Sequence, residues 1–316
     1  MAGATSCADA GVGQESTISS ASKALSEAAK EPRREALGRR ANGIAGKIVY
    51  MRVIALCLAL LVGPALGHEF WLEPVEYQIQ PGGQLKAEII IGDDFEGARM
   101  PYLPQRIVSY SVRAGENSAR VAMRIGASPG LQQAPLGDGL HVVAYESVVA
   151  IVHYPNWDKF QAFFEQKDLG DVGKRQAARS LPKDSVSEAY TRFSKTMIAV
   201  GSGKGADRRA GMEAELVALQ NPYTDKLAQG FRVQHFYKGT PRADTQIEVF
   251  RKAPAGTVVR TTVRTDKAGI AVVPVQPGHA YMLNAVVLRE PSTALVDQTH
   301  VQWETLWANL TFAVPK

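Results

Sequence analysis

Cysteine is almost absent from this chain, which has 316 residues and only Cys7 and Cys57. Because neither lies beyond residue 57, the rest of the chain can form no disulfide and must be stabilised by a hydrophobic core. The same absence excludes thiol catalysis there. No His-Glu-x-x-His zinc protease motif occurs either. We therefore expect a binding protein rather than an enzyme.

Strong charge of one sign is lacking as well. Over the whole chain, 36 Lys and Arg oppose 31 Asp and Glu. Residues 1–67 contain eight of the basic and five of the acidic residues, which leaves 28 basic and 26 acidic residues in the remainder. Nucleic-acid binding needs a dense cationic face. This near-neutral balance gives no support for a nucleic-acid partner.

A short apolar run follows Met51 and Arg52 and ends in a Gly-Pro break with small residues at Ala65 and Gly67. This order is typical of a secretory signal peptide, and the run is shorter than the ~20 apolar residues of a stable membrane span. We expect residues 51–67 to be a signal peptide cleaved between Gly67 and His68. The mature protein would then be periplasmic or secreted and have no stable transmembrane segment.

Residues 1–50 are rich in Ala, Ser, Gly and charged residues and have almost no aromatic side chain. Such a composition cannot bury enough apolar surface to fold. We interpret this segment as disordered, or as the product of a start codon assigned too early, with Met51 as the true start. A long, unusual signal region is the alternative.

Short segments of β-branched and aromatic residues recur between turn residues along the first half of the mature chain. The pattern predicts strands over 85–91, 107–113, 121–125 and 141–153, and a further strand over 188–200. Asn156 is placed to cap a helix in which Trp157, Phe160, Phe163 and Phe164 recur at helical spacing, and a second short helix fits before residue 188. The glycine-rich segment 201–209 lacks the Gly-Lys-Ser/Thr ending of a phosphate-binding loop, so we interpret it as an ordinary loop.

The second half repeats the strand pattern on a smaller scale. It predicts strands over 231–237, 245–251, 257–265, 270–275, 280–288 and 307–314. The fold class is thus mainly β, with two β-sandwich domains over 68–224 and 225–316. The second would be immunoglobulin-like or transthyretin-like, and the first would contain one or two short helices.

All six histidines lie in the mature segment, and cleavage would leave His68 with a free α-amino group. An N-terminal histidine can chelate a metal through its amine and its ring nitrogen, a donor set suited to copper or nickel. His153 and His300 are the further candidate ligands, and His300 is expected in a polar loop. The alternative is that His68 is only the residue after the cut, ahead of a strand that packs Phe70 and Trp71.

One carboxylate is expected inside an apolar strand. Glu146 lies between apolar neighbours and needs a partner if it is buried. Arg192 or Lys195 could supply that partner as a structural ion pair.

Several motifs resemble those of the domain of unknown function 4198 family. They include His68-Glu69-Phe70-Trp71-Leu72-Glu73-Pro74, Gly92-Asp93-Asp94-Phe95-Glu96-Gly97, Tyr190-Thr191-Arg192-Phe193-Ser194-Lys195-Thr196 and the closing Trp303-Glu304-Thr305-Leu306-Trp307. Members of that family are periplasmic proteins often labelled as nickel or cobalt uptake components. The family's His-x-Phe-Trp-Leu start maps onto His68, Phe70, Trp71 and Leu72, which is compatible with a ligand at the mature amino terminus.

These observations lead to one main functional hypothesis and two alternatives. The main hypothesis is an exported protein that binds a divalent transition metal (nickel, cobalt or copper) as its cofactor or cargo and passes it to a membrane transporter component. The first alternative is a β-sandwich interaction module for a protein or polysaccharide partner. The second is a copper oxidase built on the N-terminal histidine.

Overall fold

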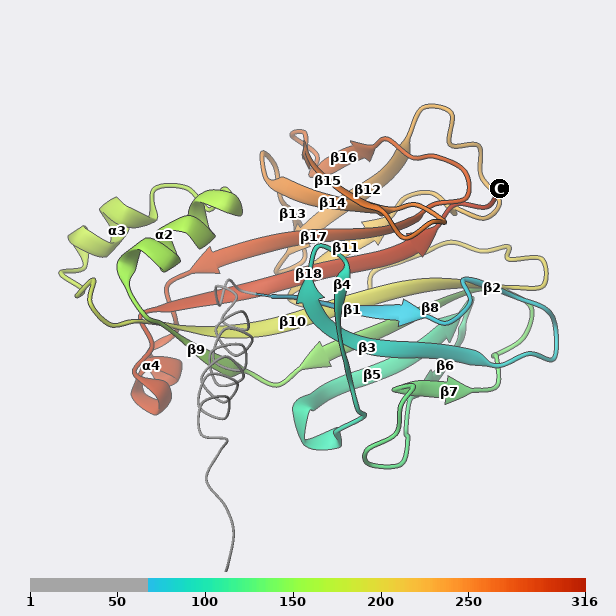
Figure 1. Cartoon of the computed structure of the whole chain (residues 1–316), viewed down its shortest axis with the longest axis horizontal. Coiled ribbons are helices and arrows are strands. Elements are labelled where there is room, and N and C mark those ends of the chain that lie inside the picture. The colour runs from blue at the N-terminus through green and yellow to red at the C-terminus, as the bar shows by residue number, and fades with distance from the viewer. Residues whose placement is uncertain (1–67) are drawn as a thin grey trace, which may run out of the picture. The chain divides into compact units, whose positions relative to one another are not determined.

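The computed structural model describes residues 68–316 (Figure 1). The segment 1–50 and the predicted signal peptide lie outside the described residues. Within residues 68–316, strands form three sheets and the helices are short. The prediction of a mainly β protein is therefore confirmed.

The largest sheet has ten strands and contains segments from both halves of the chain. Its order is β15 (Val258–Arg264), β14 (Gln246–Lys252), β17 (Ala280–Arg289), β18 (Trp303–Ala313), β10 (Val186–Val200), β8 (Gly139–Ser147), β5 (Ile107–Ala114) and β6 (Asn117–Arg120), with β2 (Gln78–Ile79) and β9 (Ala150–Tyr154) also paired to β10. The parallel pair β10–β18 runs from Glu188 opposite Trp303 to Thr196 opposite Thr311. It joins the two halves of the chain through backbone hydrogen bonds.

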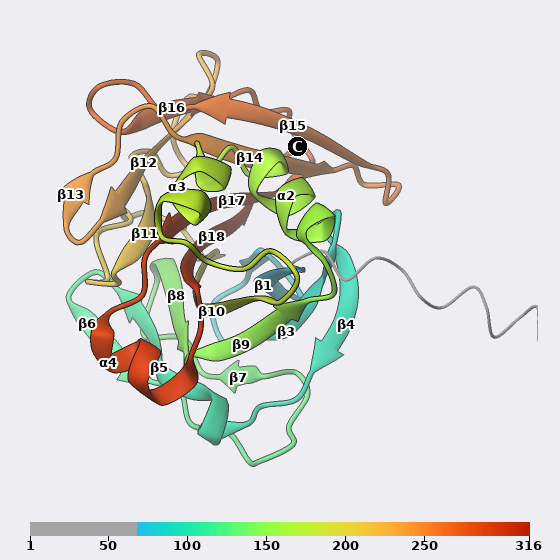
Figure 2. The same cartoon turned by 90° about the vertical axis from the view of Figure 1, so that its left-hand side faces the viewer.

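Two four-stranded sheets accompany this ten-stranded sheet. One contains β1 (Glu69–Pro74), β3 (Leu85–Asp93), β4 (Glu96–Met100) and β7 (Leu131–Gln133), and the other contains β11 (Ala214–Ala218), β12 (Phe231–Tyr237), β13 (Thr240–Pro241) and β16 (Ile270–Val273). Figure 2 shows β12 and β16 at one end of the molecule and β1, β3 and β4 beside β8 and β10. Each small sheet packs its apolar side chains against the ten-stranded sheet.

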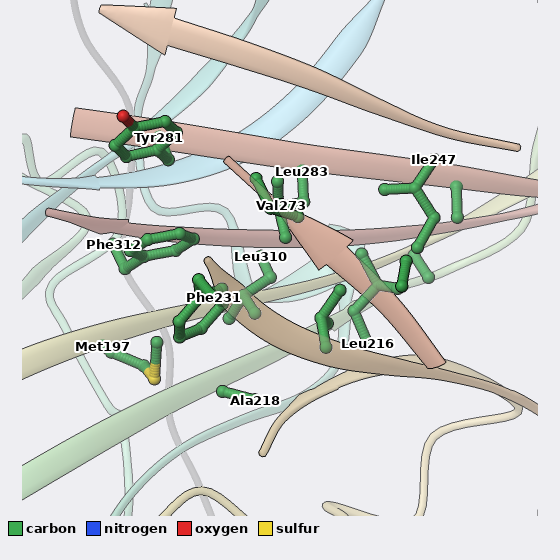
Figure 3. Close-up of a cluster of buried hydrophobic side chains, with 14 of the residues drawn as sticks. Met197, Leu216, Ala218, Phe231, Ile247, Val273, Tyr281, Leu283, Leu310 and Phe312 are labelled. Carbon is green, nitrogen blue, oxygen red and sulfur yellow. The ribbon is translucent and has the colours of Figure 1, made fainter. Parts of the chain in front are cut away.

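The main core lies between the β11–β12–β16 sheet and the ten-stranded sheet. Figure 3 shows Phe231 and Leu216 facing Phe312, Tyr281 and Ile247, and all five are buried. The rings of Phe231 and Phe312 lie 4.2 Å apart between centroids. A second core packs Phe70 and Leu72 of β1 against side chains of β3, β5 and β8.

Helices α2 (Trp157–Gln166) and α3 (Val172–Ala178) follow β9 directly and lie next to the ends of β10 and β18 (Figure 1). The predicted cap is confirmed, because the Asn156 side chain accepts a hydrogen bond from the Lys159 backbone N–H at 3.0 Å. Phe160, Phe163 and Phe164 form the buried face of α2. Among residues 68–316, no helix is long and apolar enough to cross a membrane.

Three local predictions differ from the structure. Residues 121–125 are not a strand, because the hairpin partner of β5 is β6, which ends at Arg120. The run 141–153 is two strands rather than one. β8 pairs with Met197–Val200, and β9 pairs with Val186–Tyr190. The strand is interrupted between β8 and β9 because these two segments pair with opposite ends of β10. His300 lies not in an open loop but at the end of helix α4 (Thr293–Thr299), in a left-handed conformation.

The predicted domain boundary at residues 224 and 225 falls between β11 and β12, which pair with each other. β10 and β18, on either side of that boundary, also pair. The described residues belong to one compact unit. The division into two domains stays a prediction.

We expect Phe160→Ala to lower the free energy of unfolding by about 3–5 kcal/mol. The ring is fully buried and contacts Tyr154 and Trp303 at centroid distances of 4.9 Å and 6.4 Å. Urea denaturation followed by tryptophan fluorescence measures the change. Val149→Ala, on a side chain that is 48% exposed, is the control. Equal losses in the two variants would contradict this assignment of the core.

Candidate functional site

The structure places a carboxylate beside the candidate amino-terminal ligand. β1 and β3 are antiparallel, with Glu69 opposite Gly92, so the start of β1 lies next to the end of β3. His68 Nδ1 is 2.8 Å from Asp93 Oδ2. Both side chains are about half exposed, at 46% and 53%. An imidazole and a carboxylate therefore meet at the surface, where the mature chain is predicted to begin.

A strained turn fixes Asp93 in this position. Asp94 and Phe95 join β3 to β4, and both have positive φ angles, 49° and 62°. A bulky residue rarely adopts this conformation, which costs about 1–3 kcal/mol. Phe95 is nevertheless fully buried against Trp71, at a centroid distance of 5.6 Å. Burial of the ring offsets the strain and holds the tip of the hairpin against β1.

Beneath His68, a buried ion cluster holds the start of β1. Lys167 Nζ lies 2.6 Å from Glu69 Oε1 and 2.6 Å from Glu248 Oε2, and all three side chains are buried. Asn284 also donates to Glu248 Oε2 at 3.0 Å. Burial raises the pKa of Glu69, and the charge of Lys167 opposes that shift. Because Lys167 caps α2 and Glu248 lies in β14, the cluster joins three separate elements.

A second buried acid lies on the same face of β10 as Arg192. Glu188 accepts hydrogen bonds from Tyr154 at 2.7 Å and from Thr305. Burial raises the pKa of Glu188 to about 7. The Arg192 guanidinium lies over the rings of Tyr190 and Trp307, at 4.9 Å and 5.0 Å from their centroids. Among the described residues, Arg192 Nη1 has no hydrogen-bond partner.

The expected ion pair of Glu146 is wrong. Glu146 accepts a hydrogen bond from Ser109 at 3.4 Å, and burial raises the pKa of its carboxyl. Lys195 pairs instead with Asp207 and Glu215. Arg192 packs on the aromatic rings described above. Because Arg192 and Lys195 are three residues apart in one strand, they point to opposite faces of the sheet.

The two other predicted metal ligands lie in different elements from His68. His153 is exposed on β9, and His300 is exposed at the end of α4. Among residues 68–316, no three His, Cys, Asp or Glu side chains are grouped to hold a metal ion. A site that combines His68 with His153 or His300 stays a prediction.

The buried histidines have structural partners. His141 Nε2 accepts a hydrogen bond from the Leu136 backbone N–H at 2.9 Å. His235 lies 3.2 Å from the Thr245 hydroxyl. Burial lowers the pKa of His235 to about 3, so its ring is neutral near pH 7. Both are therefore fixed parts of the core.

Sequence reasoning missed one motif. Gly126-Ala127-Ser128-Pro129-Gly130 has the residue order Gly-x-Ser-x-Gly of a nucleophile elbow. That elbow requires a strand before the serine and a helix after it. Here the segment lies between β6 and β7, and Ser128 donates a hydrogen bond to Glu88 at 2.9 Å. The context does not fit a nucleophile.

Comparison with known proteins assigns the family. The family model "Domain of unknown function (DUF4198)" matches residues 65–289. The chain belongs to this family. The match covers the His68–Asp93 pair and the Lys167 cluster, and it ends at the last residue of β17.

Two further comparisons were made. No curated protein matches the sequence. Among solved structures, the D0-D1 domain of intimin has 10% sequence identity, with 78% of this chain and 98% of that chain covered and a TM-score of 0.18. The fold described for this DUF4198 protein rests on its own strands and sheets.

We expect Lys167→Met to lower the free energy of unfolding by about 3–5 kcal/mol, because it leaves the Glu69 and Glu248 carboxylates buried without their cation. Chemical denaturation measures the loss. Lys174→Met removes an exposed ion pair with Asp171 and is the matched control, for which we expect no measurable change. A Lys167→Met protein as stable as the wild type would contradict the clamping role.

The raised pKa of Glu188 predicts that the stability of the protein depends on pH. Between its ordinary pKa of 4.5 and the folded-state pKa of about 7, the folded protein keeps a proton that the unfolded chain has lost. The contribution of Glu188 to the free energy of unfolding is therefore complete below pH 4.5 and falls by up to ~3 kcal/mol as the pH rises through 7. Glu188→Gln should weaken the dependence of the free energy of unfolding on pH, measured by urea unfolding from pH 4 to 8. Glu76→Gln, at an exposed position, should leave it unchanged.

Proposed function

We propose that this DUF4198 protein is exported, begins at His68 after cleavage, and binds a divalent transition metal at its mature amino terminus. The observation that carries the proposal is the 2.8 Å contact between His68 Nδ1 and Asp93 Oδ2. It adds a carboxylate to the amine and the imidazole that an N-terminal histidine provides. The proposal thus has a third donor without a second histidine.

The donor set fits a copper or nickel ion. An amine and an imidazole nitrogen from one residue close a chelate ring, and such nitrogen donors suit these metals. The Asp93 carboxylate adds negative charge next to the ring. We assign the chelate to the amine and Nδ1 of His68. Because Asp93 Oδ2 contacts that same nitrogen, we assign to Asp93 the role of an oxygen ligand beside the chelate.

The surroundings support a rigid but accessible site. Glu69, the next residue, is buried and paired with Lys167, so the chain direction at His68 is fixed. The His68 and Asp93 side chains are about half exposed, which leaves the metal open to a partner. These features suit delivery of the ion to a membrane transporter component, the partner that we propose.

N-terminal sequencing of the exported protein comes first, and it should return His68 as the first residue. Isothermal titration calorimetry with Ni²⁺ and Cu²⁺ should then give one bound ion per chain. Adding one alanine before His68 should abolish binding, because the amine then no longer belongs to the histidine. Unchanged affinity after that extension would refute the proposal.

Single substitutions separate the roles within the site. We expect Asp93→Asn to weaken metal binding by about 10- to 100-fold, because it removes a negatively charged oxygen donor beside Nδ1 of His68. Asp94→Asn is the matched control, because Asp94 is adjacent but faces Arg260 at 3.5 Å. His153→Ala and His300→Ala test the other two predicted ligands. A mature protein that binds neither ion would favour the interaction module instead.

A further inference from the structure

Lys195, Asp207 and Glu215 form a buried cluster that the proposed metal site does not use. Lys195 Nζ lies 2.7 Å from Asp207 Oδ2 and 3.1 Å from Glu215 Oε1. All three side chains have 0% exposure. A fully buried lysine thus contacts two carboxylates, and it donates a third hydrogen bond to the Arg208 carbonyl at 3.3 Å.

The cluster borders the main core. Lys195 shares one face of β10 with Phe193 and Met197, and Glu215 lies in β11 between Ala214 and Leu216. Those four flanking side chains belong to the same hydrophobic cluster. Asp207 comes from the loop that joins the two strands. Phe193 and Met197 of the core therefore flank the lysine, whereas strand alternation directs Glu215 to the opposite face of β11 from Ala214 and Leu216.

The two oxygens of Asp207 have different surroundings. Oδ2 accepts hydrogen bonds from Lys195 Nζ and, at 2.8 Å, from the Ala218 backbone N–H. Oδ1 is buried and has no hydrogen-bond partner among the described residues. Burial raises the pKa of Asp207, although Lys195 opposes the shift. A carboxylic acid protonated on Oδ1, with Oδ2 held by a backbone N–H, fits this arrangement.

Glu215 is held in place by two backbone N–H groups. Its Oε1 accepts a hydrogen bond from the Ala210 backbone N–H at 2.6 Å, and its Oε2 accepts one from Gly211 at 3.2 Å. The same Oε1 lies 3.1 Å from Lys195 Nζ. A fixed carboxylate within hydrogen-bond distance of an amine is the geometry of a general base.

We propose that Lys195 and Asp207 condense to an intramolecular isopeptide bond, with Glu215 as the catalytic residue that moves the protons. The net reaction joins the Lys195 ammonium and the Asp207 carboxylate into an amide and releases one water molecule. A bond forms between Nζ and Cγ, and the bond between Cγ and Oδ1 breaks. No oxidant, reductant or other reactant is needed.

The steps use only groups within the cluster. The Lys195 ammonium passes one proton through Glu215 Oε1, its contact at 3.1 Å, to Asp207 Oδ1, which leaves a neutral amine and a neutral acid. Nζ attacks Cγ, and the Ala218 N–H stabilises the negative charge that develops on Oδ2. Glu215 takes a proton from the attached nitrogen and gives it to Oδ1, which leaves as water.

Two features of the cluster assist formation of the bond. Holding amine and acid in contact replaces a bimolecular step by an intramolecular one, which raises the effective concentration by many orders of magnitude. Asp207 also lines a cavity of about 90 Å³ between β5, β8 and residues 206–212, large enough to take up the released water. The bond would attach the glycine-rich loop to β10 in a segment that has no cysteine.

Mass spectrometry of the purified, denatured protein tests the proposal. The intact mass should be lower than the sequence mass by one water molecule. Acylation of Lys195 also blocks trypsin at that residue, so the peptide Phe193–Lys204 should remain joined to Gly205–Arg208. Lys167 is the internal control, because it is also buried between two carboxylates yet should be cleaved normally.

Variants identify the roles of the acids. Asp207→Ala removes the electrophile and should restore the full sequence mass. Glu215→Gln keeps the size of the side chain but removes the base, so the uncrosslinked form should accumulate in a folded protein, with folding checked by circular dichroism. In Asp207→Asn the leaving group is ammonia, and the mass should fall by one ammonia molecule.

If the cluster contains only an ion pair, mass spectrometry gives a different result. Wild-type protein with the full sequence mass, and with Lys195 and Asp207 in separate linear peptides, would overturn the proposal. So would a crosslinked peptide that persists in Asp207→Ala. The wild-type measurement decides even if a variant fails to fold, and its result does not depend on metal binding.

Discussion

The constraint on which the rest of this structure depends is that β10 is buried on both faces although it carries charged side chains. Glu188 and Arg192 lie on one face and Lys195 on the other. Burying an unpaired charge costs several kcal/mol, so Glu188 and Lys195 are held by partners from other elements, and Arg192 packs on the Trp307 ring of β18. Tyr154, Thr305, Asp207 and Glu215 supply these partners for Glu188 and Lys195. The polar contacts therefore specify how the sheets and helices pack on this strand.

A similar buried ion cluster fixes the position of β1. Glu69 is buried, and Lys167 at the end of α2 pairs it with Glu248 of β14. Such a cluster adds little net stability compared with apolar packing, but it penalises every arrangement in which one member lacks its partner. The Phe95 ring fixes the neighbouring hairpin. Together they determine where His68 and Asp93 meet, although both of these side chains are exposed to solvent.

The sequence predicted what depends on neighbours along the chain. The Asn156 cap, the aromatic face of α2 and most strands follow from local periodicity, and they are confirmed. Contacts between residues far apart in the sequence could not be predicted in this way. Asp93 lies 25 residues from His68, and only the β1–β3 register brings them together. Glu146 pairs with neither Arg192 nor Lys195. Strand alternation, already visible in the sequence, places them on opposite faces.

The two buried lysines show why similar composition does not imply similar chemistry. Lys167 and Lys195 each contact two carboxylates, but the environments of the acids differ. Asn284 donates to Glu248 beside Lys167, and Lys167 also lies 5.2 Å from the Trp307 ring centroid, an arrangement that stabilises a cation. Beside Lys195, one Asp207 oxygen has no partner and the other meets a backbone N–H. The first environment favours a permanent ion pair. The second leaves Asp207 Oδ1 open to a proton and places a backbone N–H at Oδ2, and this contrast is the physical reason to expect a covalent bond at Lys195 alone.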